Sequence, residues 1–248
     1  MRKTLSKINL TKVIIVGNLT FFLPNLILLM RGFDSRYWAD DYCFSGILKQ
    51  YGFIKGLEFF YTTVSNRFSS FIFVATLEAF GSRSIQWVST VSILLIFSAT
   101  FLLLRSFLHN DHIRLHDGFL LFLSQVIIFF SLYISPNIEQ SVYWRSGLSH
   151  YFIPLFFLIS ISQLVLFSGM RMGKSHISVI VFLIAFFAAG LSESYAALQT
   201  GALLVAIIVL PIFQTNGCKD KVSSLVAALA GSLGGMAVMV VSPGNKCV

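Results

Sequence analysis

Charge is scarce in this sequence. Only 11% of the 248 residues are Asp, Glu, Lys or Arg, whereas a soluble domain carries about 25%. Hydrophobic residues make up 56% of the chain, and the mean hydropathy is +0.82. So few charges cannot cover that much apolar side chain in water. The composition therefore excludes a soluble enzyme, a nucleic-acid-binding protein and a disordered tail, and it predicts a protein that lives in a lipid bilayer.

Cysteine and the common cofactor motifs are also missing or rare. The three cysteines lie far apart and form neither a disulfide framework nor a zinc-binding spacing. His109, His112 and His116 stand alone in a short basic segment, so no metal site is predicted there. The sequence has no Walker loop, Rossmann fingerprint, serine elbow or His-Glu-x-x-His motif. With no soluble domain to bind a nucleotide, any activated substrate is expected to be lipid-linked.

What the chain does have is a series of long apolar runs, each near the roughly 20 residues that a helix needs to cross the hydrocarbon. We predict an all-α polytopic membrane protein, with residues 1–248 as a single transmembrane domain of about seven spans. The first run follows basic residues and lacks a small-x-small cleavage site, so a span is favoured over a signal peptide. The runs cover 13–30, 85–104, 119–134, 151–167, 177–191, 196–213 and 222–241.

Residues 62–80 are ambiguous between a further span and a surface helix. Their pattern predicts an amphipathic helix in the outer loop 31–84, lying along the membrane surface. Its apolar side would hold Phe60, Val64, Phe68, Phe71 and Ala75, and its polar side Thr63, Asn66, Arg67 and Ser70.

The charge distribution decides between these two topologies. With 62–80 outside the membrane, the loops on the N-terminal side carry ten Lys or Arg and three acids, and those on the other side carry eight and seven. Nearly all of the net charge of +8 thus falls on one side, as the positive-inside rule requires. The N-terminus is therefore predicted in the cytoplasm, and the chain in the cytoplasmic membrane.

This topology gathers the unusual residues on the outer face, where a functional site is expected. They are Asp40, Asp41, Arg67, Glu139, Trp144, Arg145, His150 and Glu193, together with Trp38 and Trp87. For the tryptophans, an interfacial aromatic belt is the alternative explanation.

Asp40 and Asp41 give the clearest chemical signal. A carboxylate that is partly desolvated near a membrane surface is suited to act as a general base, and an acid pair also suits a divalent cation. The alternative is a helix N-cap, since a run with helical pattern follows.

The other candidates have alternatives of their own. Glu193 interrupts an apolar hairpin, so it is either a functional acid or part of an exposed turn. Arg67 and Arg145 suit a phosphate leaving group or a lipid headgroup. His150 is either a site residue or an ordinary loop histidine. Gly231 and Gly235, four residues apart in the last run, predict close helix packing.

These features resemble the GT-C superfamily of integral-membrane glycosyltransferases. Members of that superfamily begin with one span and then a long outer loop that holds paired acids and a surface helix. One major branch has a module of seven spans in all, the number expected here. More narrowly, four short motifs are similar to bacterial multipass proteins of the DUF6056 and phage GtrII-like kinds. They are Ala39-Asp-Asp-Tyr42, Ser65-Asn-Arg-Phe68, Tyr143-Trp-Arg-Ser-Gly147 and Ser242-Pro-Gly-Asn245.

The resemblance implies transfer of a sugar from a polyprenyl-phosphate donor to a cell-envelope glycan or lipid acceptor, with inversion. Asp40 would be the general base, and Asp41 would orient the acceptor or a divalent cation. Arg67 and Arg145 would stabilise the lipid phosphate. Glu139, Trp144, His150 and Glu193 would complete substrate binding.

One feature departs from the family. The chain stops where such enzymes usually continue, which is expected of a minimal form or a piece of a longer enzyme. The alternatives are a non-catalytic transporter or flippase, which predicts acids near the middle of the membrane, and a subunit of a polysaccharide assembly system.

Overall fold

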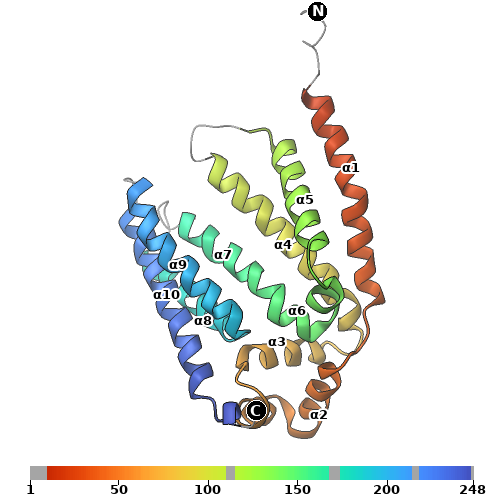
Figure 1. Cartoon of the computed structure of the whole chain (residues 1–248), viewed down its shortest axis with the longest axis vertical. Coiled ribbons are helices and arrows are strands. Elements are labelled where there is room, and N and C mark those ends of the chain that lie inside the picture. The colour runs from red at the N-terminus through yellow and green to blue at the C-terminus, as the bar shows by residue number, and fades with distance from the viewer. Residues whose placement is uncertain (1–9, 110–114, 168–173, 214–217, 247–248) are drawn as a thin grey trace, which may run out of the picture.

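The computed structural model describes residues 10–109, 115–167, 174–213 and 218–246, and within these ranges the chain is helical and has no strand. The predicted all-helical class is therefore confirmed for the described residues. Each region predicted as a span contains one long helix (Figure 1). These helices are α1 (Leu10–Arg31), α4 (Ser84–His109), α5 (Asp117–Tyr133), α7 (Ile153–Phe167), α8 (Lys174–Ala189), α9 (Glu193–Phe213) and α10 (Cys218–Val241).

Five segments in the described part of the chain are long and apolar enough to cross a membrane: Thr11–Asp34, Ser84–Leu108, Arg145–Phe167, Glu193–Ile212 and Cys218–Val241. The helices α5 and α8 are apolar but shorter, with 17 and 16 residues. Five spanning candidates are thus supported, and a total of seven stays a prediction.

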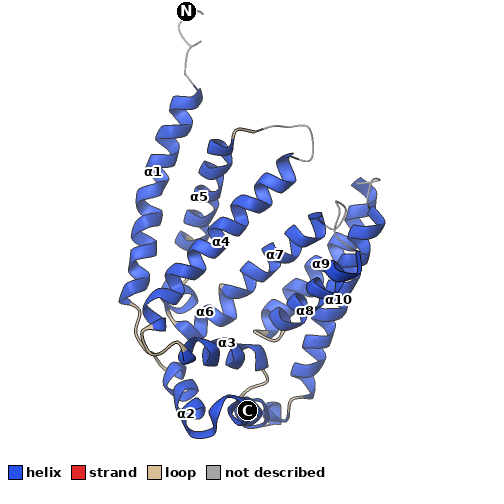
Figure 2. Ribbon diagram, turned by 180° about the vertical axis from the view of Figure 1, so that it is seen from behind, coloured by secondary structure: helices blue, strands red, loops and turns tan. Residues whose placement is uncertain are grey.

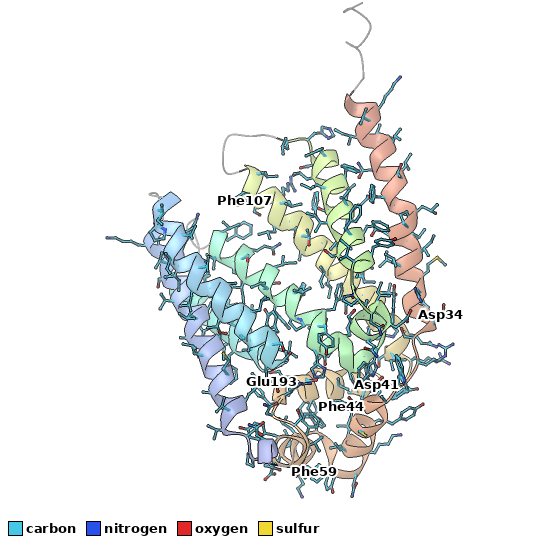
Figure 3. The ribbon with its side chains drawn as sticks, viewed as in Figure 1. Asp34, Asp41, Phe44, Phe59, Phe107 and Glu193 are labelled. Atoms are coloured by element: carbon cyan, nitrogen blue, oxygen red, sulfur yellow. The ribbon has the colours of Figure 1, made fainter. Side chains whose placement is uncertain are left out.

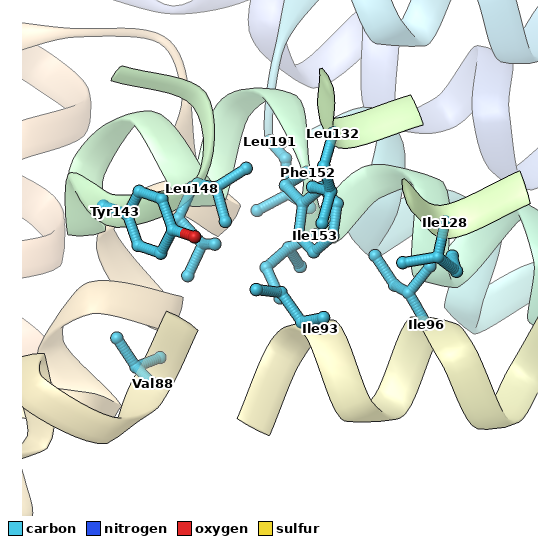
Figure 4. Close-up of a cluster of buried hydrophobic side chains, with 11 residues drawn as sticks. Val88, Ile93, Ile96, Ile128, Leu132, Tyr143, Leu148, Phe152, Ile153 and Leu191 are labelled. Atoms are coloured by element: carbon cyan, nitrogen blue, oxygen red, sulfur yellow. The ribbon is translucent and has the colours of Figure 1, made fainter. Parts of the chain in front are cut away.

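The long helices form two groups joined by α7. On one side α1 packs on α5 and α4, and on the other α8 packs on α10 and α9. The helix α7 lies between them, in contact with both α4 and α8 (Figure 2). A core of buried side chains fills the first group near one end of the bundle (Figure 4). It is formed by Val88, Ile93, Ile96, Ile128, Leu132, Val142, Tyr143, Leu148, Phe152, Ile153 and Leu191.

The short elements gather at one end of the bundle. They are η1 (Gly32–Asp34), α2 (Asp40–Phe59), η2 (Phe60–Val64), α3 (Phe68–Ala79), η3 (Glu139–Tyr143), α6 (Arg145–Tyr151) and η4 (Pro243–Lys246). Figure 1 shows α2 and α3 across this end, with η4 beside them and the start of α1 at the other end. We call the end that holds the short elements the loop-rich end. At the opposite end α1 and α10 begin and α4 ends (Figure 1); we call it the basic end, because these helix ends contain Lys12, Arg105, Lys219 and Lys221.

The segment 62–80 does not form the continuous amphipathic helix that its pattern predicts. The turn η2 ends at Val64, and α3 begins only at Phe68, after Ser65 has adopted an extended conformation. Ser70, expected on the polar side, is fully buried, and its hydroxyl lies 2.9 Å from that of Ser149 on α6. Its neighbours Phe71, Val74 and Ala75 pack against α2. The segment is therefore held inside the loop-rich end and not laid along a surface by one apolar face.

The predicted close packing of the last helix is confirmed. Gly231 and Gly235 of α10 face the backbone of α8, where a Cβ at Gly231 would collide with the carbonyl oxygen of Phe182. Gly234, one turn along, differs because its added Cβ would meet only the ring of Phe186, at 3.4 Å. In a membrane, such small residues let two helices approach closely enough for dispersion contacts to hold them together.

Gly231→Ala is expected to destabilise the protein by about 1–3 kcal/mol, because a rigid carbonyl cannot move aside as a side chain can. Gly234→Ala is the matched control, and its effect should stay within about 0.5 kcal/mol. Thermal unfolding of both variants in one detergent measures the difference. Equal effects of the two substitutions would contradict this packing.

Candidate functional site

The site is built around a backbone reversal at the start of α2. Ala39 has φ 43° and ψ −114°, a conformation that a residue with a Cβ rarely adopts. Such strain persists only where the surroundings hold it in place. Here Trp144 Nε1 donates to the carbonyl of Trp38 at 3.0 Å, and the Asp41 amide donates to the same oxygen. The two acids that follow lie in the first turn of α2 and point in different directions, as adjacent helical residues do, so that Asp40 is exposed and Asp41 is fully buried.

Asp41 is one partner in a buried ionic network. Its Oδ1 accepts a hydrogen bond from Ser146 Oγ at 2.6 Å and lies 3.4 Å from Arg145 Nε. Its Oδ2 accepts the amide of Trp38 at 3.2 Å. This bond runs backward along the chain and does not cap the first turn of α2, so the N-cap alternative is not what forms. Asp41 and Arg145 are both 0% exposed, so they bind each other and do not face a cavity.

Glu78 of α3 is the second carboxylate on the same guanidinium. Arg145 Nη1 donates to its Oε2 at 2.6 Å, Tyr37 Oη lies within 2.8 Å of both carboxylate oxygens, and Ser45 Oγ donates to Oε1. The guanidinium also lies 4.9 Å from the centre of the Tyr37 ring. Two carboxylates thus share one arginine, and the network joins the segment before α2 with α2, α3 and α6. Glu78 is not among the site residues predicted from the sequence.

Hydrogen bonding decides the ionisation of Glu78. Burial by itself would raise the pKa of this carboxyl group, but hydrogen bonds from Tyr37, Arg145 and Ser45 outweigh it and lower the pKa below its usual value of 4.5. Burial and the bond to Glu78 raise the pKa of the Tyr37 hydroxyl, which therefore stays protonated as a donor. A lowered carboxyl pKa stabilises the fold above pH 4.5, and this contribution is lost as the pH falls below 4.5 towards the folded-state pKa.

The melting temperature in detergent is therefore expected to fall below pH 4.5 in the wild type. Glu78→Gln removes this ionisation, so its deficit relative to the wild type should shrink as the pH falls. Glu58 of α2 is exposed, and Glu58→Gln is the control, expected to follow the wild-type profile. A Glu78→Gln deficit that stays constant from pH 7 to pH 4 would contradict the assigned shift.

Asp40 lines a separate cavity of about 240 Å³, which we call the Asp40 cavity. Arg67 and His150 line it with Asp40, so a carboxylate from α2, a guanidinium from the segment between η2 and α3 and an imidazole from α6 border one space. The remaining wall is formed by Cys43, Phe44, Phe60, Val64 and Ser65. The break between η2 and α3 therefore has a clear consequence, because it places Arg67 at the cavity.

Glu193 fixes the position of Arg67. Arg67 Nε donates to Glu193 Oε2 at 2.9 Å, and both side chains remain partly exposed, at 39% and 46%. Two residues after Arg67, the Ser69 amide donates to the carbonyl of Gly190 at 3.2 Å. The hairpin before α9 is thus attached to the start of α3. Figure 3 shows Glu193, Asp41 and Phe44 at the loop-rich end, with Phe107 far from them at the other.

The structure places the remaining predicted residues elsewhere at this end. Glu139 forms an ion pair with Arg31, and both line a second cavity. Trp144 lines that cavity too, with its ring centre 6.0 Å from that of Trp38. The one pocket expected from the sequence is therefore three neighbouring groups: the buried network, the Asp40 cavity and the second cavity. The Asp40 cavity and the second cavity share no lining residue.

The tight geometry of α6 explains the last residue of the Tyr-Trp-Arg-Ser-Gly motif. A Cβ at Gly147 would collide with the carbonyl oxygen of Gln140 in η3. Only glycine lets η3 and α6 fold back on each other this closely. That fold is what brings Arg145 and Ser146 to Asp41.

The described residues contain no group of three or more His, Cys, Asp or Glu that could hold a metal ion. His116 instead caps α5, because its Nδ1 accepts the Gly118 amide at 3.0 Å. His112 and the side chain of His109 lie outside the described residues.

Comparison of the chain with protein-family models, with curated proteins and with solved structures gave no match. The chemistry of the site therefore rests on its own geometry. An exposed carboxylate that shares a cavity with a guanidinium and an imidazole can accept a proton on one side while a negative charge is stabilised on the other.

Proposed function

We propose that this protein is a GT-C-type membrane glycosyltransferase. It transfers a sugar from a polyprenyl-phosphate donor to a cell-envelope glycan or lipid acceptor at the outer face of the cytoplasmic membrane. The observation that carries this proposal is the convergence of Asp40, Arg67 and His150 on one cavity at the loop-rich end.

In the proposed reaction an acceptor hydroxyl attacks the anomeric carbon of the donor. Asp40 takes the hydroxyl proton as the new C–O bond forms. The bond between the anomeric carbon and the phosphate oxygen breaks on the opposite face, so the configuration inverts. Polyprenyl phosphate leaves with the bonding electrons, and Arg67 stabilises its negative charge. The ion pair with Glu193 orients that guanidinium.

Two further observations support the proposed orientation in the membrane and the choice of an enzyme over a transporter. In the sequence, the loops at the end opposite the cavity carry ten Lys or Arg and three acids, and those at the loop-rich end carry eight and seven; this excess of positive charge in short loops supports a cytoplasmic position for the end opposite the cavity. The acids of the described residues lie in the first turns of α5 and α10 or at the loop-rich end. A transporter is expected to place acids within its spans, so this arrangement favours the enzyme over a flippase.

The test is transfer by the purified full chain in proteoliposomes. Radiolabelled polyprenyl-phosphate hexoses are supplied with envelope glycan or lipid acceptors, and the same sugars as nucleotide-linked donors form the matched control. Labelled product is expected only with the lipid-linked donors. Product formed only from nucleotide sugars, or no product from any lipid-linked donor with a folded chain, would contradict the proposal.

A further inference from the structure

The second cavity at the loop-rich end is the larger of the two and is lined on several sides by aromatic rings. Its volume is about 580 Å³, within the range of about 300–1,000 Å³ that small-molecule sites occupy. It is lined by Arg31, Asp34, Ser35, Arg36, Tyr37, Trp38, Glu139, Tyr143 and Trp144.

Three of the four aromatic side chains in the lining have their polar atoms bonded elsewhere, so they offer this cavity their rings. Tyr37 Oη is bonded to Glu78, Tyr143 Oη donates to the carbonyl of Leu28 at 2.7 Å, and Trp144 Nε1 donates to Trp38. Trp38 is 52% exposed, although a large ring at such a position would ordinarily be covered. These rings suit the flat apolar face of a ring-shaped ligand.

The charged groups of the cavity balance one another. Arg31 is paired with Glu139, and Arg36 Nη1 donates to the backbone carbonyl of Ser35 at 3.1 Å. The two arginines face two acids, Asp34 and Glu139, so the lining has no net charge. A phosphate would meet two carboxylates in the same lining, whereas a neutral ligand with hydroxyl groups can donate to the acids and accept from the arginines.

One polar atom in this lining has no partner. Ser35 is 6% exposed, and its Oγ is buried without a hydrogen bond. A buried hydroxyl in that state is unfavourable until it gains a hydrogen-bond partner. A ligand hydroxyl within the cavity would supply that partner.

We propose that this cavity is a binding site for a neutral saccharide unit, separate from the Asp40 cavity. The rings of Trp38 and Trp144 contact the apolar face of the sugar, and Asp34, Ser35 and Arg36 bind its hydroxyl groups. The inference does not rest on the proposed transfer reaction, because it concerns binding at a cavity that shares no lining residue with the Asp40 cavity.

Tryptophan fluorescence in nanodiscs tests this proposal. The chain has three tryptophans, so the Trp87→Phe variant leaves only Trp38 and Trp144 as reporters. Neutral oligosaccharides of glucose, galactose and N-acetylglucosamine are titrated separately, with glycerophosphate and phosphocholine as the charged comparison. A saturable change is expected with at least one neutral oligosaccharide and with neither charged compound.

Three variants test which residues contact the saccharide. Trp38→Ala is expected to weaken saccharide binding at least tenfold, read from the remaining Trp144 signal. Tyr133→Ala removes a ring that is 73% exposed and does not line the cavity, and it should leave binding unchanged. Asp40→Asn should also bind as the wild type does, which separates this site from the transfer reaction. No response to any neutral oligosaccharide, or a response to the phosphate compounds alone, would overturn the proposal.

Discussion

Replacing Arg145 with alanine is expected to lower the free energy of unfolding by about 3–5 kcal/mol. The guanidinium is fully buried and is shared by Asp41 and Glu78. Its removal leaves two carboxylates facing each other, one of them 0% exposed, with no cation between them. Breaking a buried pair in this way costs far more than the pair contributes, because an uncompensated charge remains in a medium of low polarity. The measurement is thermal or denaturant unfolding in detergent.

Arg105 supplies the matched control at the basic end. It pairs with Asp117 at 3.6 Å, with half of each side chain exposed, and exposed pairs contribute at most about 1 kcal/mol. Arg105→Ala should therefore cost no more than that. A triple variant, Arg145→Met with Asp41→Asn and Glu78→Gln, removes all three charges and should recover much of the stability lost by Arg145→Met alone. An Arg145→Ala variant as stable as Arg105→Ala would contradict the buried network.

The two adjacent aspartates are expected to respond to the same substitution in opposite ways. Asp40 is exposed at its cavity, so Asp40→Asn should fold normally and lose transfer by about 10²–10⁴-fold, as the loss of a general base implies. Asp41 is buried with Arg145 and Ser146, so Asp41→Asn should lower the free energy of unfolding by about 1–3 kcal/mol. Its activity per folded molecule should stay near that of the wild type.

Each variant controls for the other, since both change one carboxylate to an amide at the start of α2. The melting temperature and the rate of sugar transfer are measured on the same preparations. If Asp41→Asn lost transfer at an unchanged melting temperature while Asp40→Asn kept it, the base would be Asp41 and the assignment above would fail.

The positions of the long helices along the chain could be predicted from the sequence, because apolar runs depend only on neighbouring residues. How the helices pack into two groups was not predicted, and the orientation of the bundle in the membrane stays a prediction. The break after Val64 could not be read in this way. The apolar residues from Phe60 to Ala75 fit one helical face, but contacts made by Ser69 and Ser70 with distant segments hold α3 separately. Such tertiary contacts override the periodicity.

The residue types of the candidate site could be predicted from the sequence. Their division among the buried network, the Asp40 cavity and the second cavity could not. The Asp40–Asp41 pair and the arginines are conspicuous in so apolar a chain. Which of the two acids is buried depends on Arg145 and Ser146, which lie 104 and 105 residues from Asp41 in sequence. Glu78 gave one usable signal, as an acid within an otherwise apolar stretch. Its partner could not be identified, because Arg145 lies 67 residues away in sequence.

Labelling of Cys43 tests the central claim most directly, because this exposed cysteine lines the Asp40 cavity. With Cys218 and Cys247 changed to serine, a membrane-impermeant maleimide is added to right-side-out and inside-out vesicles. Reaction is expected from the outside only, and a polyprenyl-phosphate sugar should slow it. Reaction only from the cytoplasmic side, or at a rate that the lipid-linked sugar does not change, would contradict an outward-facing donor site at Asp40.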